Sequence, residues 1–297
     1  EKPCSQTPEE GELMIAAGRK ASKAIQVGMQ RRSGELYAAV KQLVADGAIG
    51  EALYAKSWYY RARPSIGRGR EIAVPVGLDY DLWQGPAPER PYRDNVIHYN
   101  WHFFWHWGNG ELGNNGVHTL DICRWVLGVD YPQRVTVAAS KLRYDDDQQT
   151  PDTTLATFDC GDKMIAWEST SWSDPYQTGQ GVGMEFRGSE GTIVVTDAGY
   201  TVYDLERKPV KTGAGSRGDD EHIANFLDGM RTGAKLNADV VDGHKSALFC
   251  HLGNIAVRVG RSIEVDPATG RITGDEEAVR YWAREEYRAG WNPREPG

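Results

Sequence analysis

Cysteine is scarce in this sequence, and its spacing favours no cross-link. The four cysteines among 297 residues are Cys4, Cys123, Cys160 and Cys250, with no CxxC pair. A disulfide scaffold or a zinc ribbon needs cysteines at short, regular spacings. Both classes are therefore excluded, and we expect four free thiols.

The chain also lacks a long apolar run and an excess of basic residues. No stretch approaches the roughly 20 apolar residues of a membrane-spanning helix, and no charged-then-apolar signal pattern follows Glu1. The net charge of -8 disfavours nucleic acid, because a phosphate backbone is bound by a basic stripe. We expect no membrane or nucleic-acid partner. The location is cytoplasmic by default, and periplasmic or exported if a signal lies upstream of Glu1.

Aromatic residues are abundant by contrast. Ten tryptophans and fourteen tyrosines suit a cleft that stacks sugars or flat rings, and they suit a dimer interface equally. The balance of 40% hydrophobic and 26% charged residues is that of an ordinary globular chain. At this length we expect one large domain or two smaller ones.

The first fifty residues alternate between helix and strand signals. A capping box formed by Thr7 and Glu10 predicts a helix over about 8–20. Residues 24–29 predict a short buried strand, and 35–46 predict a second helix. Because two helices and one short strand cannot make a sheet, this region is typical of the end of an α/β domain.

The chain after residue 128 changes to short runs separated by Gly, Asp or Pro. These runs predict a mostly antiparallel sheet, and they cover residues 134–143, 153–160, 164–172, 182–187, 192–196 and 200–205. Two further helices are predicted at 219–231 and 241–259. An earlier strand, at 52–61, leads into a Gly- and Pro-rich loop that includes 82–88.

A helix predicted between Asn114 and Gly128 is the most informative segment. Asn114 or Asn115 can cap its first turn, and Gly128 stands where a C-cap glycine belongs. At helical spacing one face is polar and the other apolar; the polar face holds Asn114, His118, Asp121 and Trp125, and the apolar face Gly116, Leu120, Cys123 and Leu127. His118 and Asp121 either serve chemistry or form a satisfied pair at a domain surface, and spacing alone leaves both readings open.

The only literal match to a dinucleotide fingerprint is the glycine-rich run 213–218. It precedes a helix, but the residues before it hold Pro209 and alternating charges rather than a buried strand. We interpret it as a linker.

Three histidines, His98, His102 and His106, recur every four residues, which on a helix would align three metal ligands. Adjacent aromatic residues and missing caps favour a loop that lines a cleft, so we predict no metal site. The three aspartates at 145–147 lack the Gly and Glu of a calcium loop and predict a solvated hairpin tip.

The basic pair Arg31 and Arg32 follows the short strand directly. Two guanidinium groups at a strand end could clamp a carboxylate or a phosphate. A surface salt bridge is the alternative, and both stay open.

Four segments in order resemble one family. They are Glu1-Lys2-Pro3, VGMQRR at 27–32, DLWQGPAPERPY at 81–92, and GELGNNGVHTLDICRW at 110–125. Together they resemble the Gfo/Idh/MocA family, named for glucose–fructose oxidoreductase and inositol dehydrogenase, over nearly the whole chain. The resemblance implies a Rossmann domain that binds NAD or NADP, followed by an α+β domain with a large, mostly antiparallel open sheet that often packs on another subunit.

The resemblance also implies a division of the chain. Residues 1–33 match the C-terminal remnant of the dinucleotide-binding domain, and 34–297 match the domain for substrate binding and homo-oligomerisation. The helices between 219 and 259 could pack back on the Rossmann part. The true glycine-rich loop is expected upstream of Glu1, so the chain resembles a truncated member.

Residue roles are carried over from the same resemblance. Lys2 matches the lysine beside the nicotinamide and the substrate hydroxyl, and His118 matches the acid/base histidine. Asn114 stands where dehydrogenases of the family usually have Asp, so either Asp121 supplies the charge or the proton relay is weaker. Gln30 and Trp83 resemble positions near the cofactor. Beside the resemblance, the chemistry of the side chains leads us to expect that Glu1, Pro3 and Arg31 also face the cofactor. On the same ground we expect a substrate-facing set, made of Arg32, Trp101, Trp105, Asn114, Asn115 and Asp121.

The function implied is that of an NAD(P)-dependent oxidoreductase acting on a sugar, cyclitol or related polyol. A base for the hydroxyl proton and a cation for the developing alkoxide are the groups such a reaction needs, and His118 and Lys2 supply them. An NAD-dependent glycosidase of related fold is one alternative. A non-catalytic sugar-binding or dimer-forming module is another, and neither the sugar nor the choice between NAD and NADP can be read from the residues.

Overall fold

A ten-stranded sheet runs through the molecule, and the computed structural model describes it over residues 1–174 and 179–294. The strand order is β10-β9-β2-β3-β4-β1-β5-β6-β7-β8. Their bounds are β1 Ala52–Tyr60, β2 Arg134–Ser140, β3 Thr153–Asp159, β4 Met164–Thr170, β5 Val182–Gly188, β6 Thr192–Thr196, β7 Gly199–Tyr203, β8 Pro209–Gly213, β9 Ile263–Val265 and β10 Ile272–Thr273. Only β1 and β4 pair in parallel among the described strands, so the expected large, mostly antiparallel open sheet is confirmed.

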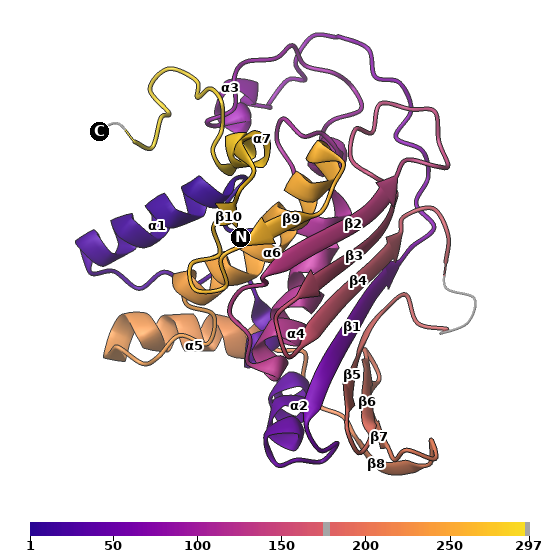
Figure 1. Cartoon of the computed structure of the whole chain (residues 1–297). Coiled ribbons are helices and arrows are strands. Elements are labelled where there is room, and N and C mark those ends of the chain that lie inside the picture. The colour runs from indigo at the N-terminus through magenta and orange to yellow at the C-terminus, as the bar shows by residue number, and fades with distance from the viewer. Residues whose placement is uncertain (175–178, 295–297) are drawn as a thin grey trace.

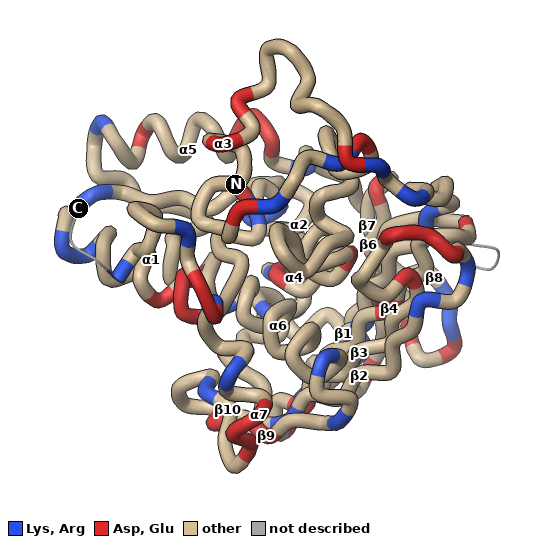
Figure 2. The backbone as a smooth tube through the Cα atoms, turned by 90° about the horizontal axis from the view of Figure 1, so that it is seen from above, with Lys and Arg blue, Asp and Glu red and all other residues tan. Residues whose placement is uncertain are grey.

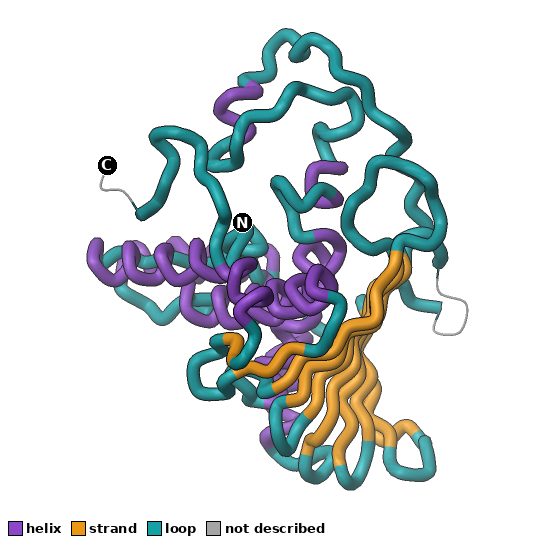
Figure 3. Tube along the Cα trace, turned by 45° about the horizontal axis from the view of Figure 1, so that its top comes forward, coloured by secondary structure: helices purple, strands orange, loops and turns teal. Residues whose placement is uncertain are grey.

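The helices gather on one face of the sheet (Figures 1 and 3). Their bounds are α1 Pro8–Ala21, α2 Glu35–Ala45, α3 Tyr80–Gln84, α4 Val117–Leu127, α5 Asp219–Thr232, α6 Val240–Val259 and α7 Glu276–Val279. Shorter helical turns cover Gln30–Ser33, Asn100–Phe103, Leu112–Gly116 and Arg280–Trp282. None of the described helices is long and apolar enough to cross a bilayer.

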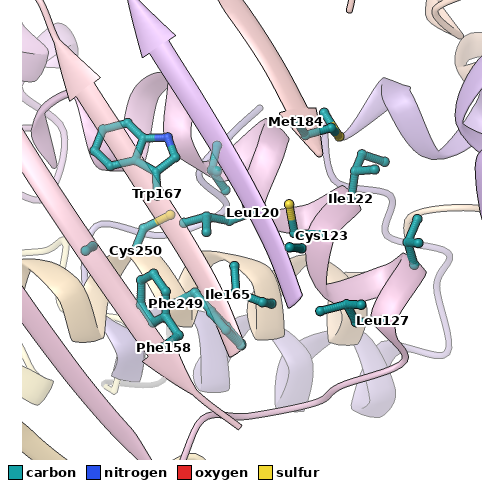
Figure 4. Close-up of a cluster of buried hydrophobic side chains, with 14 of the residues drawn as sticks. Leu120, Ile122, Cys123, Leu127, Phe158, Ile165, Trp167, Met184, Phe249 and Cys250 are labelled. Carbon is teal, nitrogen blue, oxygen red and sulfur yellow. The ribbon is translucent and has the colours of Figure 1, made fainter. Parts of the chain in front are cut away.

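The core lies between the inner face of the sheet and helices α4 and α6 (Figure 4). Alternation along the strands sends Phe158, Ile165 and Trp167 inward, where each is fully buried. Leu120 of α4 and Phe249 of α6 meet them from the helical layer. Burying a side chain of this size stabilises the fold by about 1.5–3 kcal/mol, so this cluster fixes α4 against the sheet.

Local signals place several boundaries correctly. The Thr7 hydroxyl accepts from the backbone N–H of Glu10, and the Glu10 carboxylate accepts from that of Gln6, so the predicted cap of α1 is confirmed. The Gly128 N–H caps α4 with the residue in the left-handed region at φ 69°. The four cysteines form no disulfide, as expected. Acidic and basic residues are interspersed along the chain rather than gathered in a stripe (Figure 2).

The predicted strand at 24–29 is wrong. It makes a single bridge, Gln26 to Asp239, flanked by the bonds from Val27 N–H to the Ala238 carbonyl and from Val240 N–H to the Ile25 carbonyl. The partner segment turns into α6 at residue 240, so no ladder can continue. This segment and α1 pack beside α6, and the division of the chain at residue 33 stays a prediction.

Two loop predictions are also corrected. The segment predicted as loop around 82–88 begins inside the short helix α3, which Asp79 caps through the Leu82 N–H. Of the aspartates at 145–147, Asp145 is solvent-exposed as predicted, but Asp146 is 8% exposed, accepts from the Ser65 hydroxyl at 2.7 Å and pairs with Lys141. They bind the loop at 65–70.

The glycine-rich run 213–218 begins where β8 ends. The strand that precedes it is an exposed, antiparallel edge strand paired to β7, so the prediction that no buried strand stands before the run is confirmed. The run continues past the start of α2, where the Ser216 carbonyl accepts from the Leu36 N–H. It connects β8 to α5, as a linker does.

Candidate functional site

The helical segment that carries Asn114 and His118 begins as a π-helical turn, Leu112–Gly116, before α4. Asn114 and Asn115 lie inside this turn, so the prediction that one of them caps the helix is wrong. A Cβ added at Gly116 would lie 3.0 Å from Cε2 of Trp167. The glycine lets the wide turn press against the core, and π-turns of this kind often occur at functional sites.

Lys2 binds directly to this turn. Its Nζ donates to Oδ1 of Asn114 at 2.6 Å and also to the main-chain carbonyl of Asn114. Burial lowers the pKa of the Lys2 ammonium, and the nearby carboxylate of Glu111 opposes that shift. The N-terminus of the chain is thus held one helical turn before His118.

His118 has an unpartnered buried nitrogen. No hydrogen-bond partner is found for its Nδ1 within the described residues. Burial lowers the pKa of His118 to about 3, and the positive charges of Lys2, Arg31 and Arg217 lower it further. At neutral pH the imidazole is therefore uncharged, which is the state of a proton acceptor.

Asp121 does not pair with His118. Both of its carboxylate oxygens accept from Nε of Arg32 at 2.9 Å, and Ser246 donates to it from α6. The Arg32 and Asp121 side chains are 2% and 1% exposed. The prediction that Arg32 and Asp121 bind substrate is therefore corrected, because the two side chains form a buried ion pair with each other.

Arg31 and Arg32 form neither a surface salt bridge nor an open clamp. Arg32 also reaches Asp242 at 3.3 Å, and the guanidinium of Arg31, in a buried residue, lies 5.4 Å from the ring centroid of Tyr37. Packing against α2 and α4 has drawn both side chains inward.

The cofactor-facing residues predicted at the N-terminus lie close to the π-helical turn. The backbone of Glu1 lies beside Gly28, and the ring of Pro3 lies beside Gly113. Gln30 opens the helical turn that leads to Arg32. The roles of these residues stay predictions.

A charged network that the sequence did not reveal borders Lys2. Glu111, 3% exposed, pairs with Nε of Arg63 at 2.6 Å and accepts from the Asn115 amide. Nη2 of Arg63 donates to the hydroxyls of Tyr59 and Tyr99, and the Asn114 amide also donates to Tyr99 at 3.1 Å. The i, i+4 spacing of Glu111 and Asn115 is the one sequence pattern that indicates part of this network. The partner Arg63 lies too far away in the chain to be inferred.

The three predicted tryptophans lie in three different surroundings. Trp83 stacks on Tyr80 at 5.6 Å and meets Trp107 edge-on, so it belongs to a cluster around α3. Trp101 makes an edge contact with His102. Trp105 instead lines a cavity.

That cavity has a volume of about 1080 Å³, and neither Lys2 nor His118 is among the residues that line it. It lies between the start of α1, the end of α6 and residues 277–294. The side chains that define it are Gln6, Trp105, His106, Asn109, Asn254 and Arg258. We place the candidate chemistry at Lys2 and His118, because no lysine is among the residues that line the cavity.

Two of the three spaced histidines contact main-chain carbonyls. His102 Nδ1 lies 2.6 Å from the Tyr99 carbonyl and His106 Nε2 lies 2.7 Å from that of Pro88. No group of three potential ligands is found within residues 1–174 and 179–294. The imidazoles of His102 and His106 thus bind the backbone of neighbouring loops, and His106 lines the cavity, as expected.

Comparison with known proteins supplies a family. Residues 39–293 match the model of the oxidoreductase family, C-terminal alpha/beta domain, of the Gfo/Idh/MocA group. No curated protein matches the chain. Similar solved structures include an oxidoreductase of Thermotoga maritima, with 16% identity and a TM-score of 0.64, covering 89% of this chain and 69% of that one.

Two further structures share the fold at 17% identity and a TM-score of 0.63, each over 89% of this chain and 70% of its own. One is the WlbA dehydrogenase of Bordetella pertussis, in complex with NADH and UDP-GlcNAcA. The other is an aldose-aldose oxidoreductase of Caulobacter crescentus, complexed with glycerol.

Proposed function

This chain belongs to the Gfo/Idh/MocA oxidoreductase family, and from that premise we propose that it is an NAD(P)-dependent oxidoreductase of a sugar, cyclitol or related polyol. The observation that carries the proposal is the contact of Lys2 with Asn114, one turn before an uncharged His118. A cation and a proton acceptor on one short segment are what oxidation of a secondary alcohol requires.

His118 acts as the base in this proposal. Its imidazole would accept the proton of a substrate hydroxyl, and its lowered pKa keeps it unprotonated at neutral pH. The Lys2 ammonium would stabilise the alkoxide that forms. In the reverse direction the same groups return the proton to the carbonyl oxygen.

The residues present fit the nicotinamide end of a dinucleotide. An uncharged imidazole at His118 and a lysine anchored at Asn114, one helical turn earlier, would face a reacting ring and its substrate, and Glu1, Lys2 and Pro3 would line that ring. When bound, the nicotinamide supplies the hydride acceptor. Within the described residues no glycine-rich turn joins a parallel strand to a helix, so the proposal covers only that end.

Asn114 sets the electrostatics of the proposed site. As a neutral amide it accepts from Lys2 without adding charge, and Asp121 cannot replace the missing carboxylate because Arg32 holds it. The proton relay therefore rests on His118 and Lys2 alone.

The solved relatives support the substrate class without identifying it. NADH and a nucleotide sugar accompany one of them, and the name of another describes aldose chemistry. We extend both to this chain as a proposal: NAD or NADP as cofactor and a polyhydroxylated substrate. Dimerisation through the outer face of the sheet, where Leu155 and Met164 are 48% and 42% exposed, belongs to the same proposal.

The test is turnover by the full chain with NAD⁺ or NADP⁺ and a panel of aldoses and inositols. His118→Ala is expected to lower kcat by about 10²–10⁴-fold, while nicotinamide binding stays near the wild-type value. The matched control is His106→Gln, which removes an imidazole outside the site. Unchanged kcat in His118→Ala would refute the assignment of the base.

The same assay separates the alternatives. Release of free sugar with no net cofactor reduction would select an NAD-dependent glycosidase. Sugar binding without turnover would select a non-catalytic module, for which the amide at Asn114 is the motivating observation.

A further inference from the structure

The hydroxyl of Tyr99 has both of its acceptor positions occupied by the protein. Nη2 of Arg63 donates to it at 2.8 Å and Nδ2 of Asn114 at 3.1 Å. A guanidinium can only donate, so the phenol oxygen is the acceptor in the first bond. The second bond needs the Asn114 amide to be oriented with its nitrogen toward Tyr99.

That orientation is fixed by Lys2. An ammonium has no acceptor, so the Asn114 atom 2.6 Å from Lys2 Nζ must be the oxygen. The other amide atom is then the nitrogen, and it points to Tyr99. Both lone pairs of the Tyr99 oxygen are therefore in use, and its proton is left to donate elsewhere.

Within the described residues, no acceptor for the Tyr99 proton is found. The side chain is 49% exposed, so the proton can meet a ligand. The backbone beneath it is fixed by the contact of its carbonyl with His102 Nδ1 at 2.6 Å. Arg63 is in turn held by the buried carboxylate of Glu111 at 2.6 Å.

We propose that Tyr99 is a substrate-binding residue whose hydroxyl, oriented by Arg63 and Asn114, donates a hydrogen bond to an oxygen of a polyhydroxylated ligand beside Lys2. This inference rests on the proposed function for the class of ligand. Lys2 and Tyr99 both bind the side-chain amide of Asn114. The Tyr99 hydroxyl would therefore donate to a ligand oxygen next to the one that reacts.

Tyr59 provides a matched control. Its hydroxyl accepts from the same Nη2 of Arg63, at 2.7 Å, but the residue is 8% exposed. Tyr59→Phe and Tyr99→Phe each remove one hydroxyl from the same guanidinium nitrogen. Only Tyr99→Phe removes a donor that a ligand can reach.

The experiment measures binding of myo-inositol and of D-glucose to the full chain by quenching of tryptophan fluorescence. We expect Tyr99→Phe to raise the Kd roughly tenfold, the effect of one hydrogen bond, and Tyr59→Phe to change it less than about twofold. Circular dichroism and thermal melting verify that both variants are folded.

Three results would overturn the inference: an unchanged Kd in Tyr99→Phe, equal weakening in Tyr59→Phe, or binding of neither probe by the wild type. The last would also overturn the substrate class. If the wild type binds a probe and Tyr99→Phe weakens it, yet no cofactor is reduced in the turnover assay, the Tyr99 inference stands and the proposed redox function fails.

Discussion

Removing the charge of Asp121 should destabilise the fold while leaving the proposed chemistry in place. The carboxylate accepts three bonds at 2.9 Å or less from Arg32 and Ser246, and its side chain is 1% exposed. Asp121→Asn leaves the Arg32 guanidinium buried with an amide that cannot neutralise it. Breaking a buried ion pair on one side costs about 3–5 kcal/mol.

The lower end of that range is expected, because Arg32 keeps a second carboxylate. Asp242 lies 3.3 Å from Nη1 of Arg32 and is 43% exposed, so it compensates the orphaned charge only in part. A loss of about 3 kcal/mol lowers the Tm by roughly 6–12 °C in a chain of this size.

Thermal and urea unfolding of the full chain measure the loss. Glu264→Gln is the control, because its pair with Arg134 has a similar distance, 2.7 Å, but side chains that are 57% and 54% exposed. Such a surface pair contributes about 0–1 kcal/mol. The reasoning is refuted if Asp121→Asn costs no more than Glu264→Gln.

Turnover separates the two roles that the sequence left open for Asp121. If it only holds Arg32, kcat of Asp121→Asn at a temperature where the variant is folded should stay within a few-fold of wild type. A fall of the size expected for His118→Ala would instead return Asp121 to the proton relay.

Three further outcomes follow from the structure. Burial lowers the pKa of His251 to about 3, below its unfolded value, so this residue makes the fold less stable as the pH falls from about 6.5 toward 3; His251→Asn should flatten the fall of Tm between pH 7 and 5. Asn114→Asp places a carboxylate on Lys2 and should raise the pKa of that ammonium, moving the alkaline limb of the kcat/KM profile upward, whereas Asn114→Ala should not. If copies pair through the sheet, Leu155→Lys should halve the mass measured by light scattering; an unchanged mass would exclude that face as the interface.

The parts of the fold set by near neighbours were predictable. The cap at Thr7 depends on a residue three positions away, and the strands were visible because buried and exposed residues alternate within a single run. The end of α4 at Gly128 needs only a residue that tolerates a positive φ. For each of these the physical cause lies inside the segment.

The parts set by distant partners were not predictable. Asp121 was assigned to the polar face with His118, but its partners Arg32 and Ser246 lie 89 and 125 positions away. The segment at 24–29 has the composition of a strand, yet the segment that it bridges at Asp239 enters helix α6 at the next residue, so no ladder forms. Asn114 and Asn115 are residue types that commonly cap helices, but the Gly-rich segment around them forms a π-helical turn that packs against Trp167.

Asn114 also shows why one residue can change a site without changing the fold. An aspartate at this position would accept from Lys2 equally well, but it has no N–H to offer Tyr99. The Tyr99 hydroxyl would then donate its own proton to that carboxylate, and the proton would no longer be free for a ligand. The amide therefore does two things at once: it removes a charge from beside Lys2, and it reverses the direction of the hydrogen bond to Tyr99. A lower affinity for polyols in Asn114→Asp, together with an unchanged Tm, is the combination that this reversal requires.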